Sequence, residues 1–423
     1  MKTRSMRTKP DTRRPAGVLP LSHAMVLLLL NVSIGLETPV LSLMLLARGA
    51  TFATLPLVMS ITLVVTAVCE VPSGVAADML GRRRLFCWAM ALQVVAHLVL
   101  LLPPGIAVVA VSSALRGLAL AARTGTLEAI ELDRVVAYHG DARERCAALD
   151  VLNGRLALLE SGGVGIGALA GGLLASLDAS YALLICVVVG ATACVLVGAA
   201  ILFPRDARHV GAKRSSLAAA LADMRATLAA PGDVRLVLVN SASAGIVMLA
   251  VETYWQLAFQ QLAGVGCEWM LGPLNCAGTL AAALGSSAAM RWGASLSQAL
   301  GRQGRRMLYG LVHVAAAICL LLFAFAANVW LFSAVYLLYY VCIAARSVIE
   351  QTVLHNAVPS EERAGMASVQ SLALRGGGAL ASATGGWVVA AFGVAGVWPL
   401  YAAASLALEL VAFASDARAA RTG

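Results

Sequence analysis

The sequence predicts an all-α membrane protein in which twelve transmembrane helices form two pseudo-symmetric bundles of six. Of its 423 residues, 60% are hydrophobic and only 13% are charged, whereas about a quarter of the residues of a soluble domain are charged. The apolar residues form runs that are too long for barrel strands, which leaves helices to satisfy the backbone in lipid. The basic residues fall mainly in alternate loops. Most of the chain is therefore expected to lie in lipid.

Each apolar run has the roughly 20 residues that a spanning helix needs. Together the runs fill the chain, so we expect no soluble domain of useful size. The predicted helices cover residues 20–46, 53–77, 85–103, 105–131, 146–176, 181–203, 235–260, 269–290, 307–327, 329–350, 364–391 and 396–415.

These runs divide the chain into five parts. They are a basic cytoplasmic tail over residues 1–19, a six-helix bundle over 20–203, a cytoplasmic linker over 204–234, a second bundle over 235–415 and a tail over 416–423. The first 20 residues hold six Lys or Arg, but the apolar run that follows is too long for the core of a signal peptide. We expect this run to be retained as the first helix.

The orientation follows from the loop charges. Even-numbered loops carry Arg82, Arg83 and Arg84; Arg134, Arg143 and Arg145; Arg205, Arg208, Lys213, Arg214 and Arg225; Arg302, Arg305 and Arg306; and Arg363. Odd-numbered loops carry almost only Arg48. Because basic loops stay in the cytoplasm, both termini are expected there. The net charge of +9 then reflects membrane topology, and we expect no nucleic-acid partner.

The two halves share short sequence features, which indicates an internal repeat. Glu37-Thr38 and Glu252-Thr253 are each followed twelve residues later by a glycine, Gly49 or Gly264. Two Glu-Arg pairs each open a helix that leads to a Gly-Gly pair: Glu144-Arg145 leads to Gly171-Gly172, and Glu362-Arg363 leads to Gly385-Gly386.

The turn between the second and third predicted helices carries the most specific motif. Residues 74–84 read GVAADMLGRRR, which resembles the G-x-x-x-D-R-x-G-R-R loop of the major facilitator superfamily, with Met79 in place of a basic residue. The resemblance implies that Arg82 or Arg83 pairs with an acid at the cytoplasmic end of helix four, where Asp133 lies. The conformational latch so predicted contains Gly74, Asp78, Gly81, Arg82, Arg83 and Asp133. The alternative is a plain positively charged anchor.

Helix five contains a glycine motif, Gly163, Gly167, Gly171 and Gly172. It resembles the G-x-x-x-G-P-x-x-G-G motif of proton-coupled drug antiporters in the superfamily, except that Ala168 replaces the proline. The alternative is close packing of helices through small residues.

Charged residues inside predicted spans are the candidates for proton coupling, since a charge at the bilayer centre costs about 2.5–3.5 kcal/mol and normally faces a cavity or partner. They are Glu37 in helix one, its symmetry mate Glu252 in helix seven, and Arg116 in helix four. Glu37 lies deeper and beside Pro39, so we expect it to bind the proton and Glu252 to contact substrate. The alternative is a static Glu–Arg pair. Similar depth in helices two and four predicts a structural pair between Glu70 and Arg123.

The resemblance implies that helices one, four, seven and ten line a central cavity. The candidates for substrate contact there are Asn31, Tyr254, Gln256, Tyr336, Tyr340 and Arg346. Acids mixed with aromatic rings suit amphipathic or cationic organic substrates. For the aromatic residues the alternative is an interfacial belt.

We therefore predict a monomeric transporter in a bacterial cytoplasmic (inner) membrane, similar to bacterial drug or metabolite exporters. It is expected to export a small organic compound in exchange for protons by alternating access. The alternatives are a proton-coupled importer of a small metabolite, a membrane sensor or an enzyme. Residues 123–133 and 70–74 carry the resemblance to the exporters. No cofactor or metal is expected, because the nine cysteines and six histidines show no ligand spacing and no catalytic motif occurs.

Overall fold

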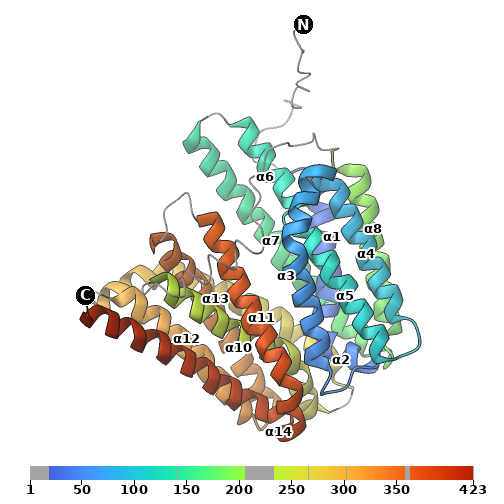
Figure 1. The fold of residues 1–423 in the computed structure, drawn as a ribbon. Helices are drawn as coiled ribbons and strands as arrows, with labels where there is room; N and C mark the ends of the chain where they lie inside the picture. The colour runs from blue at the N-terminus through green and yellow to red at the C-terminus, as the bar shows by residue number, and fades with distance from the viewer. Residues whose placement is uncertain are drawn as a thin grey trace.

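The computed structural model describes residues 19–139, 141–204, 233–264, 266–301, 303–357 and 363–422. Regular structure within these ranges is entirely helical (Figure 1). The basic tail up to residue 18 and most of the predicted linker lie outside the described residues, as does Glu362 of the second Glu-Arg pair.

The helices follow the order that the apolar runs predict. The first half of the chain contains α1 Leu21–Glu37, η1 Thr38–Val40, α2 Leu41–Ala47, α3 Leu55–Leu80, α4 Arg82–Leu100, α5 Ile106–Arg123, α6 Leu127–Tyr138, α7 Ala142–Ala175 and α8 Ala182–Leu202. The second half contains α10 Asp233–Ala263, α11 Glu268–Ala299, α12 Gly304–Ala324, α13 Val329–Ala357 and α14 Arg363–Thr422.

Among the described residues, nine helical segments are long and apolar enough to cross a membrane. One of them, Leu21–Ala47, runs through α1, η1 and α2, and the longest, Val369–Ala412, holds two helices that meet at Gly393. Leu55–Glu70 in α3 is a shorter apolar helix. The all-α membrane architecture is thus confirmed. The count of twelve crossings, which this pattern fits, stays a prediction.

The predicted fourth helix is not continuous. A single helix over 105–131 is wrong, because the chain leaves α5 after Arg123 and resumes in α6 at Leu127. The turn between them contains Gly125, whose φ of 69° is a left-handed conformation that favours glycine. The turn reads Arg-Thr-Gly-Thr over residues 123–126, so a polar interruption with a glycine marks it in the sequence.

The first span is broken where the sequence places Pro39. Proline lacks a backbone N–H and clashes with the preceding turn, so α1 ends at Glu37 and the chain continues as η1. Gln256 from the other half of the chain satisfies the backbone at this break. Its side-chain amide donates to the Thr38 carbonyl oxygen at 3.0 Å and accepts from the Ser42 N–H at 2.7 Å.

Glycines allow α7 to pack directly against the backbone of α1. A Cβ at Gly171 would overlap the carbonyl oxygen of Leu36, and one at Gly167 would overlap that of Val32. Gly163 lies against the side chain of Asn31 and the backbone of α1. Three glycines of the helix-five motif therefore serve contacts within the first bundle.

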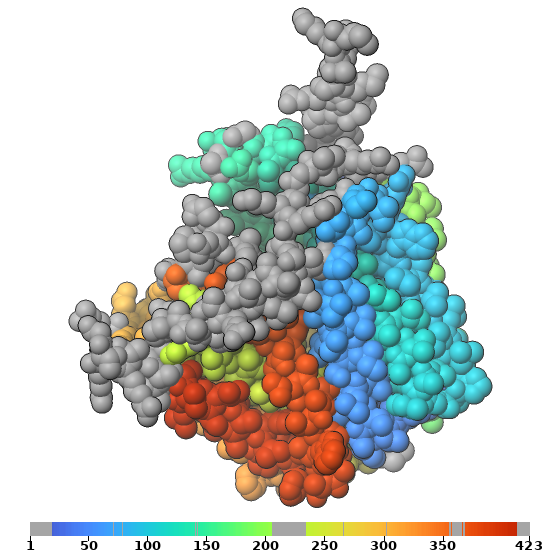
Figure 2. All heavy atoms as spheres, in the orientation of Figure 1, coloured from blue at the N-terminus to red at the C-terminus, as the bar shows by residue number. Residues whose placement is uncertain are grey.

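The two bundles meet at the end opposite the turn 81–84, which we call the basic end. Figures 1 and 2 show the first half of α14 beside α3. Near the start of α3, Ser382 donates to the Pro56 carbonyl oxygen. On the other side of the interface, the fourth glycine of the motif, Gly172, approaches Gly272 of α11 so closely that a Cβ would lie 2.7 Å from the Gly272 nitrogen. The structure is thus closed at the end opposite the basic end.

We predict that Gly171→Val lowers the free energy of unfolding by about 1–3 kcal/mol, because the added atoms must displace α1. The matched control is Gly162→Val in the same helix, where a Cβ would meet no atom within 4 Å. Thermal unfolding of the purified protein in detergent measures both. Equal midpoints for the two variants would contradict the packing described for Gly171.

Candidate functional site

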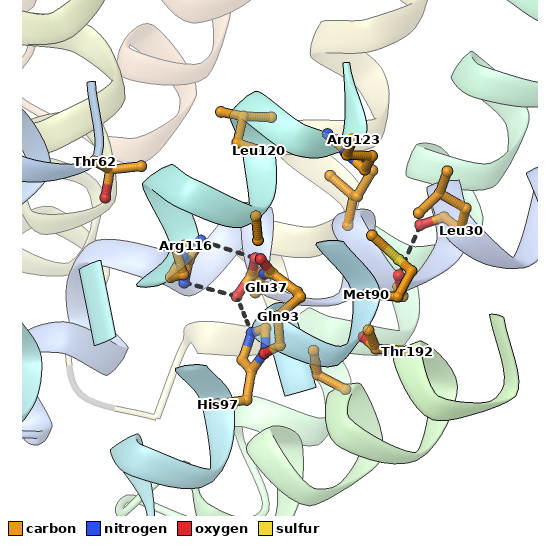
Figure 3. Close-up of a pocket in the computed structure, with 14 residues that line it drawn as sticks. Leu30, Glu37, Thr62, Met90, Gln93, His97, Arg116, Leu120, Arg123 and Thr192 are labelled. Carbon is orange, nitrogen blue, oxygen red and sulfur yellow. Dashed lines mark hydrogen bonds and ion pairs between the residues drawn. The ribbon is translucent and has the colours of Figure 1, made fainter. Parts of the chain in front are cut away.

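A cavity of about 180 Å³ lies inside the first bundle. Its polar lining comes from α1, α3, α4, α5 and α8: Ser33, Glu37, Thr62, Gln93, His97, Arg116, Arg123 and Thr192. Figure 3 shows that Glu37, His97 and Arg116 point toward one another in this cavity. The sequence predicts two of these three, Glu37 and Arg116, whereas His97 is absent from the candidates.

Glu37 is bonded by two basic side chains. The Arg116 guanidinium donates to both carboxylate oxygens, at 2.9 and 2.8 Å, and His97 Nε2 lies 2.9 Å from Oε2. Glu37 is only 7% exposed and His97 1% exposed. Burial of a carboxylate is tolerated where it is paired and hydrogen-bonded, as it is here. The Glu–Arg pair that the sequence left as an alternative is thus present.

The contacts of His97 require a proton beyond the one that a neutral imidazole carries. His97 Nδ1 lies 2.8 Å from the Gln93 carbonyl oxygen, which can only accept, so Nδ1 holds a hydrogen. The other ring nitrogen faces the Glu37 carboxyl group. That contact is a hydrogen bond only if a second proton sits on His97 or on Glu37. The hydrogen-bond geometry of the cluster is therefore consistent with one proton held between His97 and Glu37.

A second cavity, of about 230 Å³, lies between the bundles. It is lined mainly by apolar side chains, and its charged lining residues are Arg116, Glu252 and Arg375. Thr62 and Arg116 also line the first cavity, so the two cavities share a wall. Arg116 therefore stands between the proton-binding cluster and the space between the bundles.

Glu252 has a different environment from Glu37. The Tyr340 hydroxyl donates to Glu252 Oε1 at 3.0 Å, and no ion pair is formed with any described residue. Arg116 lies about three turns after the start of α5, and Tyr340 lies about three turns after the start of α13. The matching acids of the two halves therefore have different partners: Arg116 and His97 bind Glu37, whereas Tyr340 binds Glu252.

The other predicted cavity residues occupy varied places. Tyr336 is buried beside Tyr340, with ring centroids 4.8 Å apart. Tyr254 belongs to the apolar core, and Gln256 bridges the bundles as described above. Asn31 bonds within its own helix, to the Leu27 carbonyl oxygen. None of the four lines either cavity described here.

Arg346 is buried in the second bundle away from both cavities. It forms an ion pair with Glu350, which also accepts hydrogen bonds from Ser241 and Gln370. The pair joins α13 to α10 and α14. Arg346 therefore takes part in the interior of the second bundle in this conformation.

The turn at the basic end contains the predicted ion pair. Arg82 Nη1 lies 2.6 Å from Asp133 Oδ2. Arg83 instead donates to the carbonyl oxygens of Ala200 and Phe203, at 2.8 and 3.1 Å, and so ties α4 to the end of α8. Gly81 has a φ of 92°, which favours glycine at this tight connection. The side chain of Asp78 lies outside what the structure describes, and Gly74 touches no other helix.

Two ion pairs toward the basic end differ from what the sequence predicts. The ion pair of Arg82 connects α4 with α6 in the same bundle, so it does not itself bridge the bundles. The predicted pair between Glu70 and Arg123 is wrong, because Glu70 pairs with Arg375 of α14 at 3.4 Å. The position of Glu70 in the sequence gives its height along α3. It does not show on which side of the helix Glu70 lies, and in the structure this side faces α14.

The comparisons with known proteins agree with this fold. A family model described as Major Facilitator Superfamily matches residues 24–303. No curated protein matches. Among solved structures, the nucleoside transporter NupG is similar at 14% identity and a TM-score of 0.73, over 93% of this chain and 98% of that one. An inward-facing, unoccupied bacterial homolog of the human lysosomal transporter Spinster is similar at 14% identity and a TM-score of 0.66, over 95% and 96%.

We predict that Arg82→Ala slows turnover more than it destabilises the fold. The two side chains of its ion pair are 32% and 56% exposed, and exposed pairs contribute about 0–1 kcal/mol. The control is Arg84→Ala, an exposed arginine of the same turn. Membrane abundance, unfolding midpoint and transport rate are measured for each. A variant with normal abundance and an unchanged rate would remove the latch from consideration.

Proposed function

Because the chain belongs to the major facilitator superfamily, we propose that it exports a small organic compound across a bacterial cytoplasmic membrane in exchange for protons. Family and fold place it among secondary transporters rather than enzymes. The substrate, the coupling ion and the direction belong to the proposal.

The observation that carries proton coupling is the cluster of Glu37, His97 and Arg116. Because the Gln93 oxygen can only accept, a hydrogen bond between His97 and Glu37 needs a second proton on one of these two groups, and this supports the assignment. A buried site of this kind changes its charge when the proton leaves. The change is costly in a low-dielectric interior, so it favours a rearrangement of the groups around it.

Arg116 transmits that change to the central cavity. With the proton bound, two basic groups compete for one carboxylate; without it, Arg116 keeps the carboxylate for itself. The same guanidinium lines the central cavity. Protonation of the cluster therefore alters the strength of the ion pair between Arg116 and Glu37. It also alters how strongly the Arg116 charge can interact with a substrate in the central cavity.

The contacts between the bundles support alternating access. At the closed end, the backbones of α7 and α11 touch through Gly172 and Gly272. On the basic side of the central cavity, the ion pair of Glu70 and Arg375 crosses from α3 to α14. Small-residue contacts can separate without repacking large side chains, and one half-exposed ion pair can break or tighten at small cost.

Export rather than import is favoured by the glycine motif of helix five, which resembles that of drug antiporters. A proton-coupled importer is the second candidate. Proteoliposomes under an imposed pH gradient, with a panel of compounds, separate the two. Uptake of substrate into liposomes with an acidic interior, opposite to the outward flux of protons, indicates exchange, whereas uptake driven by an acidic exterior, in the same direction as the protons, indicates cotransport.

The predicted orientation puts both termini in the cytoplasm. Reporter fusions within residues 204–234 and at the C-terminus should both give a cytoplasmic signal, because the loops of the basic end carry most of the arginines. A fusion in the loop after Arg48 should give the opposite signal. A periplasmic signal from either of the first two fusions would overturn the topology.

We predict that Glu37→Gln reduces gradient-driven transport to the level of protein-free liposomes, because an amide cannot carry the proton. Substrate exchange without a gradient should persist. Glu252→Gln should mainly weaken substrate binding. The control is Glu144→Gln, an exposed acid at the start of α7. Gradient-driven transport of normal size and pH dependence in Glu37→Gln would exclude Glu37 as the proton site.

A further inference from the structure

The two cavities, whose linings share Thr62 and Arg116, hold two charges that no ion pair in the described structure balances. Arg116 is paired with Glu37, and Arg375 is paired with Glu70. The remaining cation is Arg123 in the first cavity, and the remaining anion is Glu252 in the central cavity. The cation without an ion pair therefore lies in the first cavity, and the anion without an ion pair lies in the central cavity.

Arg123 is the last residue of α5, and it lines the first cavity. A guanidinium has five N–H donors, yet no hydrogen bond or ion pair joins this one to any residue that the structure describes. Glu128, Glu37 and Glu160 attract it only through space. In Figure 3 dashed lines reach Arg116, Glu37 and His97, whereas none reaches Arg123. Its donors are available to an acceptor in the cavity.

Glu252 is the complementary group. A carboxylate can accept about four hydrogen bonds, and Glu252 accepts one, from Tyr340. The Tyr336 and Tyr340 rings pack together behind it. A carboxylate with accepting capacity to spare can bind the amine of an organic cation through charge-assisted hydrogen bonds.

The two unpaired groups are well separated. Arg123 lies two helical turns beyond Arg116 along α5, which corresponds to about 10 Å. The central cavity lies on the other side of Arg116, and its walls there are apolar: Leu41, Leu45, Met59, Leu63, Met248 and Leu249. A ligand that reaches both charges must therefore carry an apolar body between two charged ends.

We propose that the transported compound is an amphipathic zwitterion whose anionic end binds Arg123 and whose amine end binds Glu252. This inference rests on the proposed transport function and names its substrate class. A simple lipophilic cation leaves Arg123 unmatched, and a simple anion leaves Glu252 unmatched. A neutral compound of the same shape leaves both charges without a partner, which costs affinity in a site shielded from water.

Four compounds with one carbon skeleton test the charge pattern: ω-aminocaprylic acid, octylamine, caprylic acid and caprylamide. Ligand-induced stabilisation of the purified protein against thermal unfolding gives the affinity of each. A charge-assisted contact is worth about a ten- to hundredfold change in affinity. We expect ω-aminocaprylic acid to bind at least tenfold more tightly than the other three.

Two variants assign the ends. Arg123→Gln should weaken ω-aminocaprylic acid by about ten- to hundredfold and leave octylamine unchanged, whereas Glu252→Gln should weaken octylamine and leave caprylic acid unchanged. Arg84→Gln, on the outer surface, is the control and should change none of them. Equal affinity for octylamine and ω-aminocaprylic acid, or a response of ω-aminocaprylic acid to neither variant, would overturn the proposal.

Binding is measured without a pH gradient, so the two proposals fail separately. Zwitterion binding without gradient-driven uptake into proteoliposomes would leave the substrate class standing and reject proton exchange. Gradient-driven uptake of octylamine in preference to ω-aminocaprylic acid, corrected for leakage into protein-free liposomes, would leave proton exchange standing and reject the zwitterion.

Discussion

The burial of one carboxylate, Glu37, constrains the first bundle more than any other interaction. In lipid an unpaired charge is costly, and removing one partner from a buried pair costs about 3–5 kcal/mol. The carboxylate therefore fixes three helices at once: α1 through the break at Pro39, α5 through Arg116 and α4 through His97. For the same reason the cluster is sensitive to protonation. Gain or loss of a proton changes its net charge, and the low-dielectric interior around it screens that charge poorly.

Contacts between the bundles follow a different rule from contacts around Glu37. Where the bundles touch, glycines bring backbones together, and van der Waals contact replaces specific polar pairing. The bridging polar contacts are few: Gln256 to the break in α1, Ser382 to Pro56, and Glu70 to Arg375. Strong pairing inside a bundle and weak pairing between bundles are what a rigid-body movement requires, since each bundle can stay intact while the interface changes.

The sequence predicts most of the fold and about half of the site. Hydropathy and motifs give the position of a residue along a helix, but they do not give the direction in which its side chain points. Apolar runs locate the helices, Pro39 locates the break, and the repeat of Glu-Thr locates both acids. Rotation about a helix axis is not encoded in hydropathy, so Glu70 was paired with Arg123 instead of with Arg375. His97 could be found only as a lone histidine in an apolar run, a signal with no spacing rule. The turn at Gly125 does have a signal, because the polar residues 123–126 interrupt the apolar run, but the predicted helix extends across it.

The two halves of the chain differ most informatively in the partners of their matching acids, Glu37 and Glu252. Both halves keep the acid, but the first half faces it with Arg116 and His97, while the second half faces it with Tyr340. Two basic partners occupy both carboxylate oxygens of Glu37, which suits the proton role proposed for it. A single hydroxyl partner leaves Glu252 with accepting capacity toward the central cavity. The different partners of the two acids fit the proposed division between a site for the coupling ion at Glu37 and a site for the substrate at Glu252. Arg116 is the charged side chain that lines both cavities.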